Sequence, residues 1–422
     1  MVDKKTVLDL HKRAQGKIEI FPKVHLGTED ELSAYYTPGV SLVSEEIRDD
    51  INKVYDYTMK SNTIAIVSDG TRILGLGNIG PQAGLPVMEG KAALFKKFGG
   101  VDAIPICVDT KDENEIVKLV RNIAPAFGGI NIEDIESPKS FRIAHRLEKE
   151  LDIPVFHDDR QGTGVVTLAA LLNSLKLAGK DKSAKIVVNG AGSAGFGITD
   201  ILVHSGFKNI VVVDKTGSLY KGRKESMNDY KMEIANLTNP KGENGNLYEI
   251  SPGADVLIGA SSQGAFNKDI IQSMNEKPIV FALANPHPEI EYEEAMEAGA
   301  FIVATGRSDR PNQVNNLLAF PGIMRGLLDS RAKKVNYEML QSAANAIANA
   351  SKKPDRDHVI ASIRGDDFAL GIMPEIAAAV AQAAVASGEA RIKLTHKQAK
   401  ERAAKLMTRY YGIEKNIRKY LV

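Results

Sequence analysis

Residues 185–195 read Lys-Ile-Val-Val-Asn-Gly-Ala-Gly-Ser-Ala-Gly, and this stretch decides the fold of the second half of the chain. It predicts a buried strand, a tight glycine turn and the start of a helix that continues to His204. The first glycine permits the turn, the second lets the backbone approach a pyrophosphate, and the third lets helix and strand pack closely. The helix start also offers free N–H groups to phosphates. We therefore expect a dinucleotide coenzyme to be bound by Gly190, Gly192, Ser193, Ala194 and Gly195.

Asp214 closes the next predicted strand, 19 positions after Gly195. A dinucleotide-binding fold places the acid that binds the adenosine ribose at this point. Its carboxylate can accept both ribose hydroxyls and repels a 2′-phosphate, which favours NAD over NADP. Nearby cations could neutralise such a phosphate, namely Lys215, Lys221, Arg223 and Lys224. We expect NAD as the coenzyme, with NADP possible.

Around this stretch, short β-branched runs alternate with helix-length segments, a pattern typical of parallel α/β sheets. Strands are predicted over 63–67, 103–108, 130–134, 155–159, 185–189, 209–214, 255–258, 278–283 and 301–304, and helices over 86–98, 113–124, 140–151 and 164–177. The predicted fold class is α/β. We place an N-terminal α/β domain at 1–160, a Rossmann-type domain at 161–390 and a basic helical segment at 391–422.

The composition excludes several classes of protein. A chain of 422 residues is too long for one ordinary core, and its 25% charged and 43% hydrophobic residues are typical of globular domains. Lys and Arg total 54 against 53 Asp and Glu, so no overall charge attracts nucleic acid or an anionic membrane. A single cysteine, Cys107, excludes an intramolecular disulfide, and the charged N-terminus lacks a signal-peptide core. We expect a cytoplasmic protein that binds neither membranes nor nucleic acids.

Two acidic pairs end predicted strands ahead of the nucleotide-binding stretch: Glu133-Asp134 and Asp158-Asp159. Ligands of α/β sheets gather at the carboxyl ends of strands, so these acids could converge. Carboxylate oxygens with open water positions suit Mg²⁺ or Mn²⁺, whereas no Cys/His spacing indicates zinc. Adjacent acids on a strand point to opposite faces, so we do not expect all four to bind one ion.

Several further motifs follow one another along the chain. They are Tyr36-Thr-Pro-Gly-Val40, Ser68-Asp-Gly-Thr-Arg72 continuing to Gly80, Leu85-Pro-Val-Met-Glu-Gly90-Lys91, Ile132-Glu-Asp-Ile135, Phe156-His-Asp-Asp-Arg-Gln-Gly-Thr163, Ala284-Asn285-Pro286 and Thr305-Gly-Arg-Ser-Asp309 through Asn316 to Gly322. With the glycine turn, this series resembles the malic enzymes of the short bacterial and archaeal type over residues 10–390. The resemblance implies oxidative decarboxylation of L-malate to pyruvate and CO2, with a nicotinamide coenzyme and a divalent metal. It also implies a substrate-binding and dimerisation domain ahead of the Rossmann domain, and a homodimer or higher oligomer.

The resemblance also implies a role for single residues. Tyr36 matches the family's general-acid tyrosine and Lys91 its general-base lysine. Arg72 matches the arginine that holds a malate carboxylate. The metal ligands match Glu133, Asp134 and Asp159, with Asp158 beside them, and the amides of the substrate and nicotinamide pocket match Asn285 and Asn316.

Lys91 can accept the proton of the malate C2 hydroxyl only in its neutral form. The reference pKa of a lysine is about 10.4, so we expect burial or the nearby charge of Arg72 to depress it. The sequence also departs from the family pattern at a few positions. Arg160 and Gln161 stand where Gln-His is common, Glu136–Phe141 replaces an Ala-Pro and Cys-Phe pattern, and Arg310 replaces an aromatic residue.

Two alternatives remain open at this stage. An oxaloacetate decarboxylase or a malolactic enzyme with retained NAD would use the same fold and pocket. A non-catalytic nucleotide-sensing protein would need the glycine turn but not Tyr36, Lys91, Arg72 and the acidic pairs together. The sequence therefore favours the enzyme.

Overall fold

The computed structural model describes residues 3–363 and 370–417, and its strands form two sheets. The first sheet is wholly parallel, in the order β2-β1-β3-β4, with helices α5, α6 and α7 between successive strands. Because each crossover runs through a helix, the carboxyl ends of all four strands lie at one edge. The bounds are β1 Thr63–Ser68, β2 Asp102–Cys107, β3 Gly129–Ile132, β4 Val155–His157, α5 Gly80–Gly99, α6 Glu113–Ile123 and α7 Lys139–Glu150.

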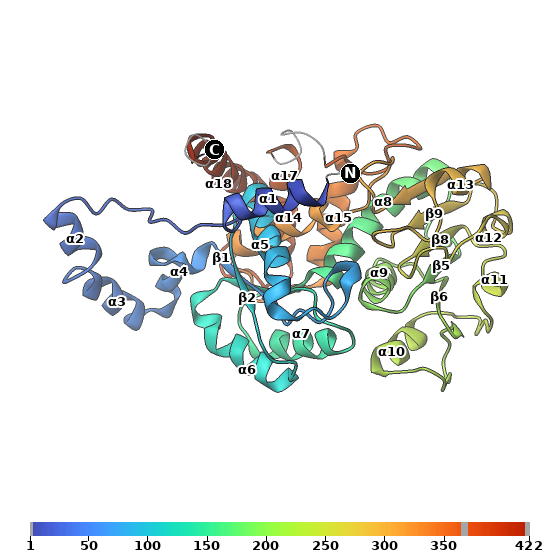
Figure 1. Cartoon of the computed structure of the whole chain (residues 1–422), viewed down its shortest axis with the longest axis horizontal. Coiled ribbons are helices and arrows are strands. Elements are labelled where there is room, and N and C mark those ends of the chain that lie inside the picture. The colour runs from blue at the N-terminus through green and yellow to red at the C-terminus, as the bar shows by residue number, and fades with distance from the viewer. Residues whose placement is uncertain (1–2, 364–369, 418–422) are drawn as a thin grey trace.

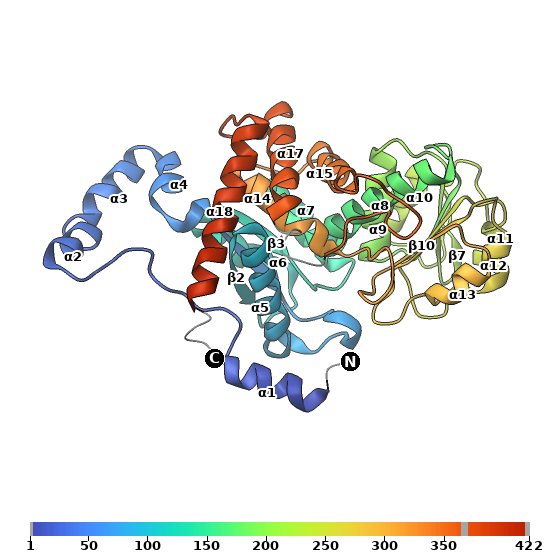
Figure 2. The same cartoon turned by 90° about the horizontal axis from the view of Figure 1, so that it is seen from above.

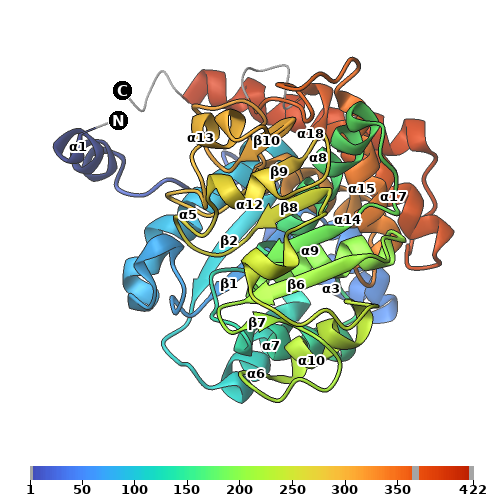
Figure 3. The same ribbon diagram turned by 90° about the vertical axis from the view of Figure 1, so that its right-hand side faces the viewer.

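The second sheet has the order β10-β9-β8-β5-β6-β7 and is parallel except for the short β7 (Figure 3). The strand order reverses direction at β5, where α/β sheets bind nucleotides. The bounds are β5 Ile186–Asn189, β6 Ile210–Asp214, β7 Gly217–Ser218, β8 Val256–Gly259, β9 Ile279–Ala282 and β10 Ile302–Thr305, with α8 Thr163–Ala178, α9 Ser193–His204, α10 Asp229–Leu237, α11 Leu247–Ile250, α12 Lys268–Gln272 and α13 Tyr292–Glu297.

The helices that follow the second sheet in the chain pack against the unit built on the first sheet. α14 (Phe320–Asp329) and α18 (His396–Ile417) both pack on α5, and α17 (Met373–Ala386) packs on α14, on α18 and on α15 (Tyr337–Ala350) (Figure 2). The fully buried carboxylate of Asp329 binds Arg325 at 3.0 Å and Arg402 of α18 at 2.9 Å. The described part of the basic C-terminal segment is thus a helix anchored on the first unit.

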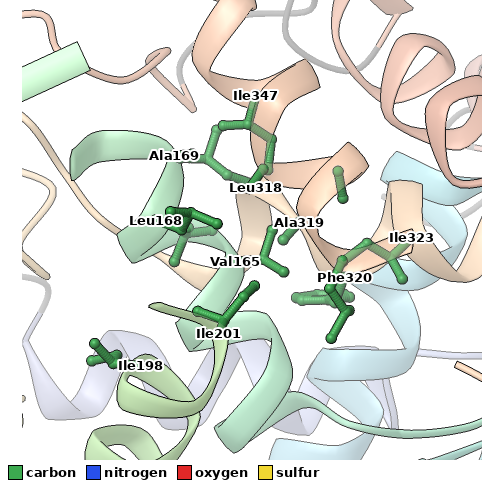
Figure 4. Close-up of a cluster of buried hydrophobic side chains, with 14 of the residues drawn as sticks. Val165, Leu168, Ala169, Ile198, Ile201, Leu318, Ala319, Phe320, Ile323 and Ile347 are labelled. Carbon is green, nitrogen blue, oxygen red and sulfur yellow. The ribbon is translucent and has the colours of Figure 1, made fainter. Parts of the chain in front are cut away.

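One apolar cluster joins the two units. Figure 4 shows Val165 and Leu168 of α8, Ile198 and Ile201 of α9, Phe320 and Ile323 of α14 and Ile347 of α15 meeting side by side. All of these side chains are buried. Burial of each large apolar side chain contributes about 1.5–3 kcal/mol, so this cluster fixes the two sheets relative to each other.

The N-terminal helices stand apart from this body. α2 (Glu29–Tyr35) and α3 (Val40–Asp49) project away from the sheets (Figure 1), and α1 (Lys4–Ala14) stands clear of the body in Figure 3. None of these three helices contains a buried residue. The remaining short elements are α4 Val54–Tyr57, η1 Ile51–Lys53, η2 Met59–Ser61, η3 Leu74–Leu76, η4 Ala124–Ala126, η5 Asp158–Gly162 and η6 Asn316–Leu318.

The predicted α/β class is confirmed, and the nine predicted strands are observed to within two residues at each end. After Arg331, the described residues contain helices and no strand. Two strands end two residues earlier than predicted, at Ile132 and His157, because the acidic pairs leave the sheet. Within residues 3–363 and 370–417, no helix is both long and apolar enough to cross a membrane.

Substitution of Gly326 should test the packing of α14 on α17. A Cβ at this position would lie 2.5 Å from the carbonyl oxygen of Ala377 and 2.8 Å from the Val380 Cβ. Gly326→Ala should therefore lower the free energy of unfolding by about 1–3 kcal/mol, measured by urea denaturation. In α18, a Cβ at Gly412 meets nothing within 4 Å, so Gly412→Ala should be neutral or stabilising by up to about 1 kcal/mol. Equal effects of the two substitutions would contradict this account of the packing.

Candidate active site

Two strand ends of the first sheet bring the acidic pairs together. β3 and β4 are parallel neighbours with Ile132 opposite His157, so the residues that follow each strand lie side by side. The pair 133–134 follows β3, and the pair 158–159 opens the π-helical turn η5. Neither pair lies on a strand, so the expectation that adjacent acids point to opposite sheet faces is wrong. Asp134 adopts a left-handed φ of 51°, which turns the chain out of the sheet.

Lys91 of α5 enters this cluster from the side. Its Nζ lies 3.0 Å from Glu133 Oε1 and also forms an ion pair with Asp158 Oδ2. Asn316, at the start of η6, donates its side-chain amide to the same Asp158 oxygen. The Lys91 ammonium also lies 3.9 Å from the ring centroid of Phe320. All these contacts are formed by buried or half-buried side chains, so the site is largely shielded from water.

The charge state of Lys91 differs from the prediction. Burial lowers the pKa of Lys91, but the negative charges of Asp158 and Glu133 raise it more, and the resulting pKa lies above the usual lysine range. The predicted depression of this pKa is therefore wrong for the ligand-free protein. Because the two carboxylates that it contacts raise its pKa, Lys91 favours its protonated form.

The carboxylates repel one another strongly. Burial raises the pKa of Asp134 to about 9, with further contributions from Asp159 and Glu133. Burial also raises the pKa of Asp158 to about 8 and that of Glu133 above its ordinary value. Asp158 Oδ1 is buried without a hydrogen-bond partner, and the backbone N–H of Asp134 donates to Asp159 Oδ2 at 3.1 Å. A buried set of hard oxygen donors that cannot all ionise has the chemistry of a divalent-cation site.

The arrangement of these side chains is not yet that of a metal site. Within residues 3–363 and 370–417, no three His, Cys, Asp or Glu side chains are already placed to hold one ion. Instead, the Lys91 ammonium bridges two of the carboxylates. The donor set therefore fits Mg²⁺ or Mn²⁺ by its chemistry, and binding would require these side chains to rearrange.

The glycine turn between β5 and α9 has the close backbone contacts expected of a dinucleotide site. Gly190 has a φ of 123°, and a Cβ there would lie 2.3 Å from the Ala260 carbonyl oxygen. A Cβ at Gly195 would lie 1.9 Å from the Gly190 carbonyl oxygen. Ser193 begins α9, and its buried hydroxyl has no hydrogen-bond partner. The turn thus leaves donors free for phosphate oxygens.

The loop after β1 connects the two sites. The nearest side-chain atom to a Cβ built at Gly192 is Nη1 of Arg72, at 3.8 Å. In the same loop, a Cβ at Gly75 would lie 3.4 Å from Pro286, which follows Asn285 beyond β9. The backbone N–H of Arg72 donates to the Asp134 carbonyl oxygen at 3.1 Å. Arg72 therefore lies between the carboxylate cluster and the nucleotide turn.

Asp214 is occupied by protein donors. Arg223 Nη2 lies 2.8 Å from its Oδ1, Lys231 Nζ lies 2.6 Å from its Oδ2, and Thr216 donates both its backbone N–H and its hydroxyl. The Asp214 side chain is only 7% exposed. Hydrogen bonds to these groups outweigh the effect of burial and lower the pKa of Asp214 to about 2. An ionised Asp214 is thus present, but its lone pairs are already used by the loop that follows β6.

The structure does not bring Tyr36 to Lys91. Tyr36 caps the end of α2, which projects away from the body (Figure 1), and the residue is 72% exposed. The predicted residues therefore fall into three groups. Lys91, Glu133, Asp134, Asp158, Asp159 and Asn316 form one cluster, the glycine turn with Arg72 and Asn285 lies next to it, and Tyr36 is remote.

Three contributors to the site escaped the sequence analysis. Asn131 donates to Glu133 Oε2 at 2.7 Å, Phe320 faces the Lys91 ammonium, and Lys231 binds Asp214. Asn131 is only two residues from Glu133 in the chain, so the first could have been found. Phe320 and Lys231 are farther along the chain from Lys91 and Asp214, and no local pattern identifies these two contacts.

The sequence matches two family models and several known proteins. A family model described as "Malic enzyme, N-terminal domain" matches residues 15–116, and one described as "Malic enzyme, NAD binding domain" matches residues 160–385. The chain is 52% identical over 402 residues to the bifunctional malic/malolactic enzyme of Bacillus subtilis, covering 94% of this chain and 97% of that protein. It is 50% identical over 379 residues to the NAD-dependent malic enzyme of Geobacillus stearothermophilus, covering 89% and 78%.

A solved structure is also similar to this chain over nearly its whole length. The malic enzyme of Pyrococcus horikoshii superposes with a TM-score of 0.95 at 47% identity, covering 99% of both chains. An NADP-dependent malic enzyme of Rhizobium meliloti is 46% identical over 401 residues, which cover 91% of this chain and 52% of that protein. Relatives of similar identity are thus named for both coenzymes.

Divalent-cation binding should strengthen as the pH rises from 6 to 8.5. The pKa values of about 8 for Asp158 and about 9 for Asp134 lie far above the unfolded value of about 4. In the metal-free protein, the contribution of these two groups to the free energy of unfolding is fully present below about pH 4. It is lost as the pH rises toward 8–9, because unfolding lets the two carboxyls ionise. A cation must displace the same protons. Added Mn²⁺ should therefore raise the Tm more at pH 8.5 than at pH 6.

The control for this experiment is Asp134→Asn, which should lose most of the Mn²⁺-dependent Tm increment at pH 8.5. A Tm increment that is larger at pH 6 than at pH 8.5 in the wild type would contradict the assignment of these carboxyls to the cation.

Proposed function

This chain belongs to the malic enzyme family, and we propose that it catalyses the oxidative decarboxylation of L-malate to pyruvate and CO2 with reduction of NAD or NADP. One observation carries the proposal: a buried lysine ammonium lies in a cluster of carboxylates beside a dinucleotide-binding turn. A proton-accepting group and a coenzyme that accepts hydride must lie this close, because one substrate carbon loses both its hydroxyl proton and its hydride.

The proposed metal ligands are Glu133, Asp134 and Asp159, with Asp158 beside them. A Mg²⁺ or Mn²⁺ ion held by these residues would supply Lewis-acid polarisation of the substrate, which would favour both hydroxyl ionisation and loss of CO2. The raised pKa values of Asp134 and Asp158 and the unpartnered Asp158 Oδ1 support this assignment.

Lys91 is the proposed general base. Asp158 and Glu133 hold the proton on its amine in the ligand-free protein. Burial by itself lowers a lysine pKa, and a cation held by these carboxylates would offset the charges that raise the pKa of Lys91. In its neutral form, the Lys91 amine would accept the C2 hydroxyl proton. Asn316, which shares Asp158 with Lys91, keeps the carboxylate in place during this change.

Arg72 is the proposed clamp for a malate carboxylate. Its guanidinium can bind a carboxylate through two parallel hydrogen bonds. Its position beside Gly192 would hold such a substrate between the carboxylate cluster and the coenzyme. Asn285, which lies against Gly306 at the edge of the second sheet, is the proposed amide on the nicotinamide side.

Tyr36 is the proposed general acid, acting in the site of a second copy of this chain. α1, α2 and α3 bury no residue, yet they expose large apolar side chains that include Leu8, Leu32 and Leu42. Short helices gain their stability in water from packing, so this segment needs a partner surface. A homodimer that exchanges the N-terminal segments would cover these apolar side chains and bring Tyr36 to the partner.

NAD is the proposed preferred coenzyme, because a carboxylate at the end of β6 disfavours a 2′-phosphate. Arg223 and Lys231 offset the charge of this carboxylate, Asp214. We therefore expect NADP to be used as well, with a preference for NAD below about tenfold in kcat/KM, equivalent to about 1.4 kcal/mol. A second candidate activity, non-oxidative conversion of malate to lactate, is suggested by the name of the Bacillus subtilis relative.

The first test is a malate assay with Mn²⁺ and with NAD and NADP in parallel. Reduced coenzyme and pyruvate should form in equal amounts, and omission of the metal should abolish both. Lactate formed without net coenzyme reduction would favour the malolactic activity. Absence of all three products in folded protein would refute the proposed function, and a tenfold or greater preference for NADP would refute only the coenzyme assignment.

A complementation experiment tests Lys91 and Tyr36 together. Lys91→Ala should lower kcat by about 10²–10⁴, and Tyr36→Phe should also impair turnover. If Tyr36 acts in the partner's site, a mixed dimer of the two variants has one site with both residues intact and one site with neither. Subunit exchange at equal concentrations should then restore about a quarter of the wild-type activity. If Tyr36 acts within its own chain, every site carries one lesion and no activity returns.

A further inference from the structure

Arg160 occupies the same π-helical turn as Asp158 and Asp159 but points the opposite way. Its Nη2 donates to Asp200 Oδ2 of α9 at 2.6 Å, and its guanidinium carbon lies 4.7 Å from the ring centroid of Phe196. The Arg160 side chain is 16% exposed and that of Asp200 only 6%. The turn that carries two carboxylates of the candidate metal site is therefore tied to α9 by a largely buried ion pair.

Backbone contact reinforces this connection. A Cβ at Gly197 of α9 would lie 2.0 Å from the carbonyl oxygen of Arg160, and a Cβ at Gly164 would lie 2.6 Å from the carbonyl oxygen of Gly197. No side chain therefore separates η5 and the start of α8 from α9 at these points. A displacement of α9 must move the backbone of η5 as well, because close-packed segments cannot shift independently.

The Asp200 end of the ion pair is itself held in place. Tyr337 of α15 donates its hydroxyl to Asp200, at 2.8 Å from Oδ1 and 2.9 Å from Oδ2. The ring of His204 stacks on Tyr337, with centroids 3.5 Å apart and an angle of 7° between the planes. Asp200 thus joins Arg160 to two helices, and this fixed carboxylate sets the position of the guanidinium.

Helix α9 also begins at the nucleotide turn, with Ser193 as its first residue. The same rigid helix therefore meets the coenzyme at its amino end and Arg160 one to two turns later. We propose that Arg160 is a positioning residue that couples coenzyme binding at α9 to divalent-cation binding by the carboxylates next to η5. This proposal rests on the proposed function, because it takes the nucleotide and the cation as the two ligands. Metal affinity depends on such indirect supports, whose loss typically weakens binding 10- to 100-fold.

The test measures Mn²⁺ affinity from the electron paramagnetic resonance signal of free Mn²⁺, with and without NAD. In the wild type, we expect NAD to tighten Mn²⁺ binding. In Arg160→Gln, we expect Mn²⁺ to bind at least about tenfold more weakly and the effect of NAD to be lost. Asp200→Asn, which keeps the shape of the side chain, should show the same two changes. Arg160→Lys, which can still pair with Asp200, should recover part of the affinity.

Lys180→Gln is the matched control. Lys180 pairs with Asp255 at 2.5 Å, and its side chain is also 16% exposed, but this pair lies where β5 and β8 begin, at the edge opposite the nucleotide turn. The control should lower the Tm without changing Mn²⁺ affinity by more than about twofold. Three results would overturn the proposal. They are unchanged Mn²⁺ binding in Arg160→Gln, equal weakening of Mn²⁺ binding in Arg160→Gln and Lys180→Gln, and no effect of NAD on Mn²⁺ binding in the wild type. A wild type that binds neither Mn²⁺ nor NAD would instead refute the proposed function.

Discussion

The ammonium group of Lys91 lies between the carboxylates of Glu133 and Asp158, and three separate parts of the chain must meet to place it there. α5 supplies the lysine, the ends of β3 and β4 supply the acids, and the segment entering α14 supplies Asn316 and Phe320. A buried carboxylate cluster without a cation would strongly oppose folding. Lys91 balances part of this charge, and the raised pKa values of Asp134 and of its own partner Asp158 indicate that the balance is incomplete.

This incomplete balance of charge suggests how Lys91 and its neighbouring carboxylates can contribute both to the stability of the fold and to the proposed reaction. The carboxylates around Lys91 raise its pKa and favour its charged form, although the proposed general base must be neutral. A divalent cation that binds to the acids would remove the reason for the lysine to keep its proton. Under the proposed function, Lys91 would reach its catalytic charge state only with a cation bound, which would link catalysis to ligand binding through electrostatics.

Close backbone contacts hold the nucleotide turn and the carboxylates in place relative to each other. Gly190 and Gly195 let β5, the turn and α9 approach one another, and Gly197 lets α9 approach the turn that follows β4. These contacts tolerate no side chain, so the distance between the nucleotide turn and the carboxylates is set by the backbone rather than by adaptable side chains. The N-terminal helices α1, α2 and α3 show the opposite situation, because none of them buries a residue against the part of the chain that the structure describes.

The sequence by itself determined the parallel α/β fold, the glycine turn and the positions of the two acidic pairs. These features depend on local pattern, since strand periodicity and glycine conformation are properties of neighbouring residues. Only the tertiary structure decided which charges meet. It placed Lys231 on Asp214, left Tyr36 far from Lys91 and raised the pKa of Lys91 where burial alone would have lowered it. Charge states follow from distances between residues that are remote in the chain, and no local pattern encodes those distances.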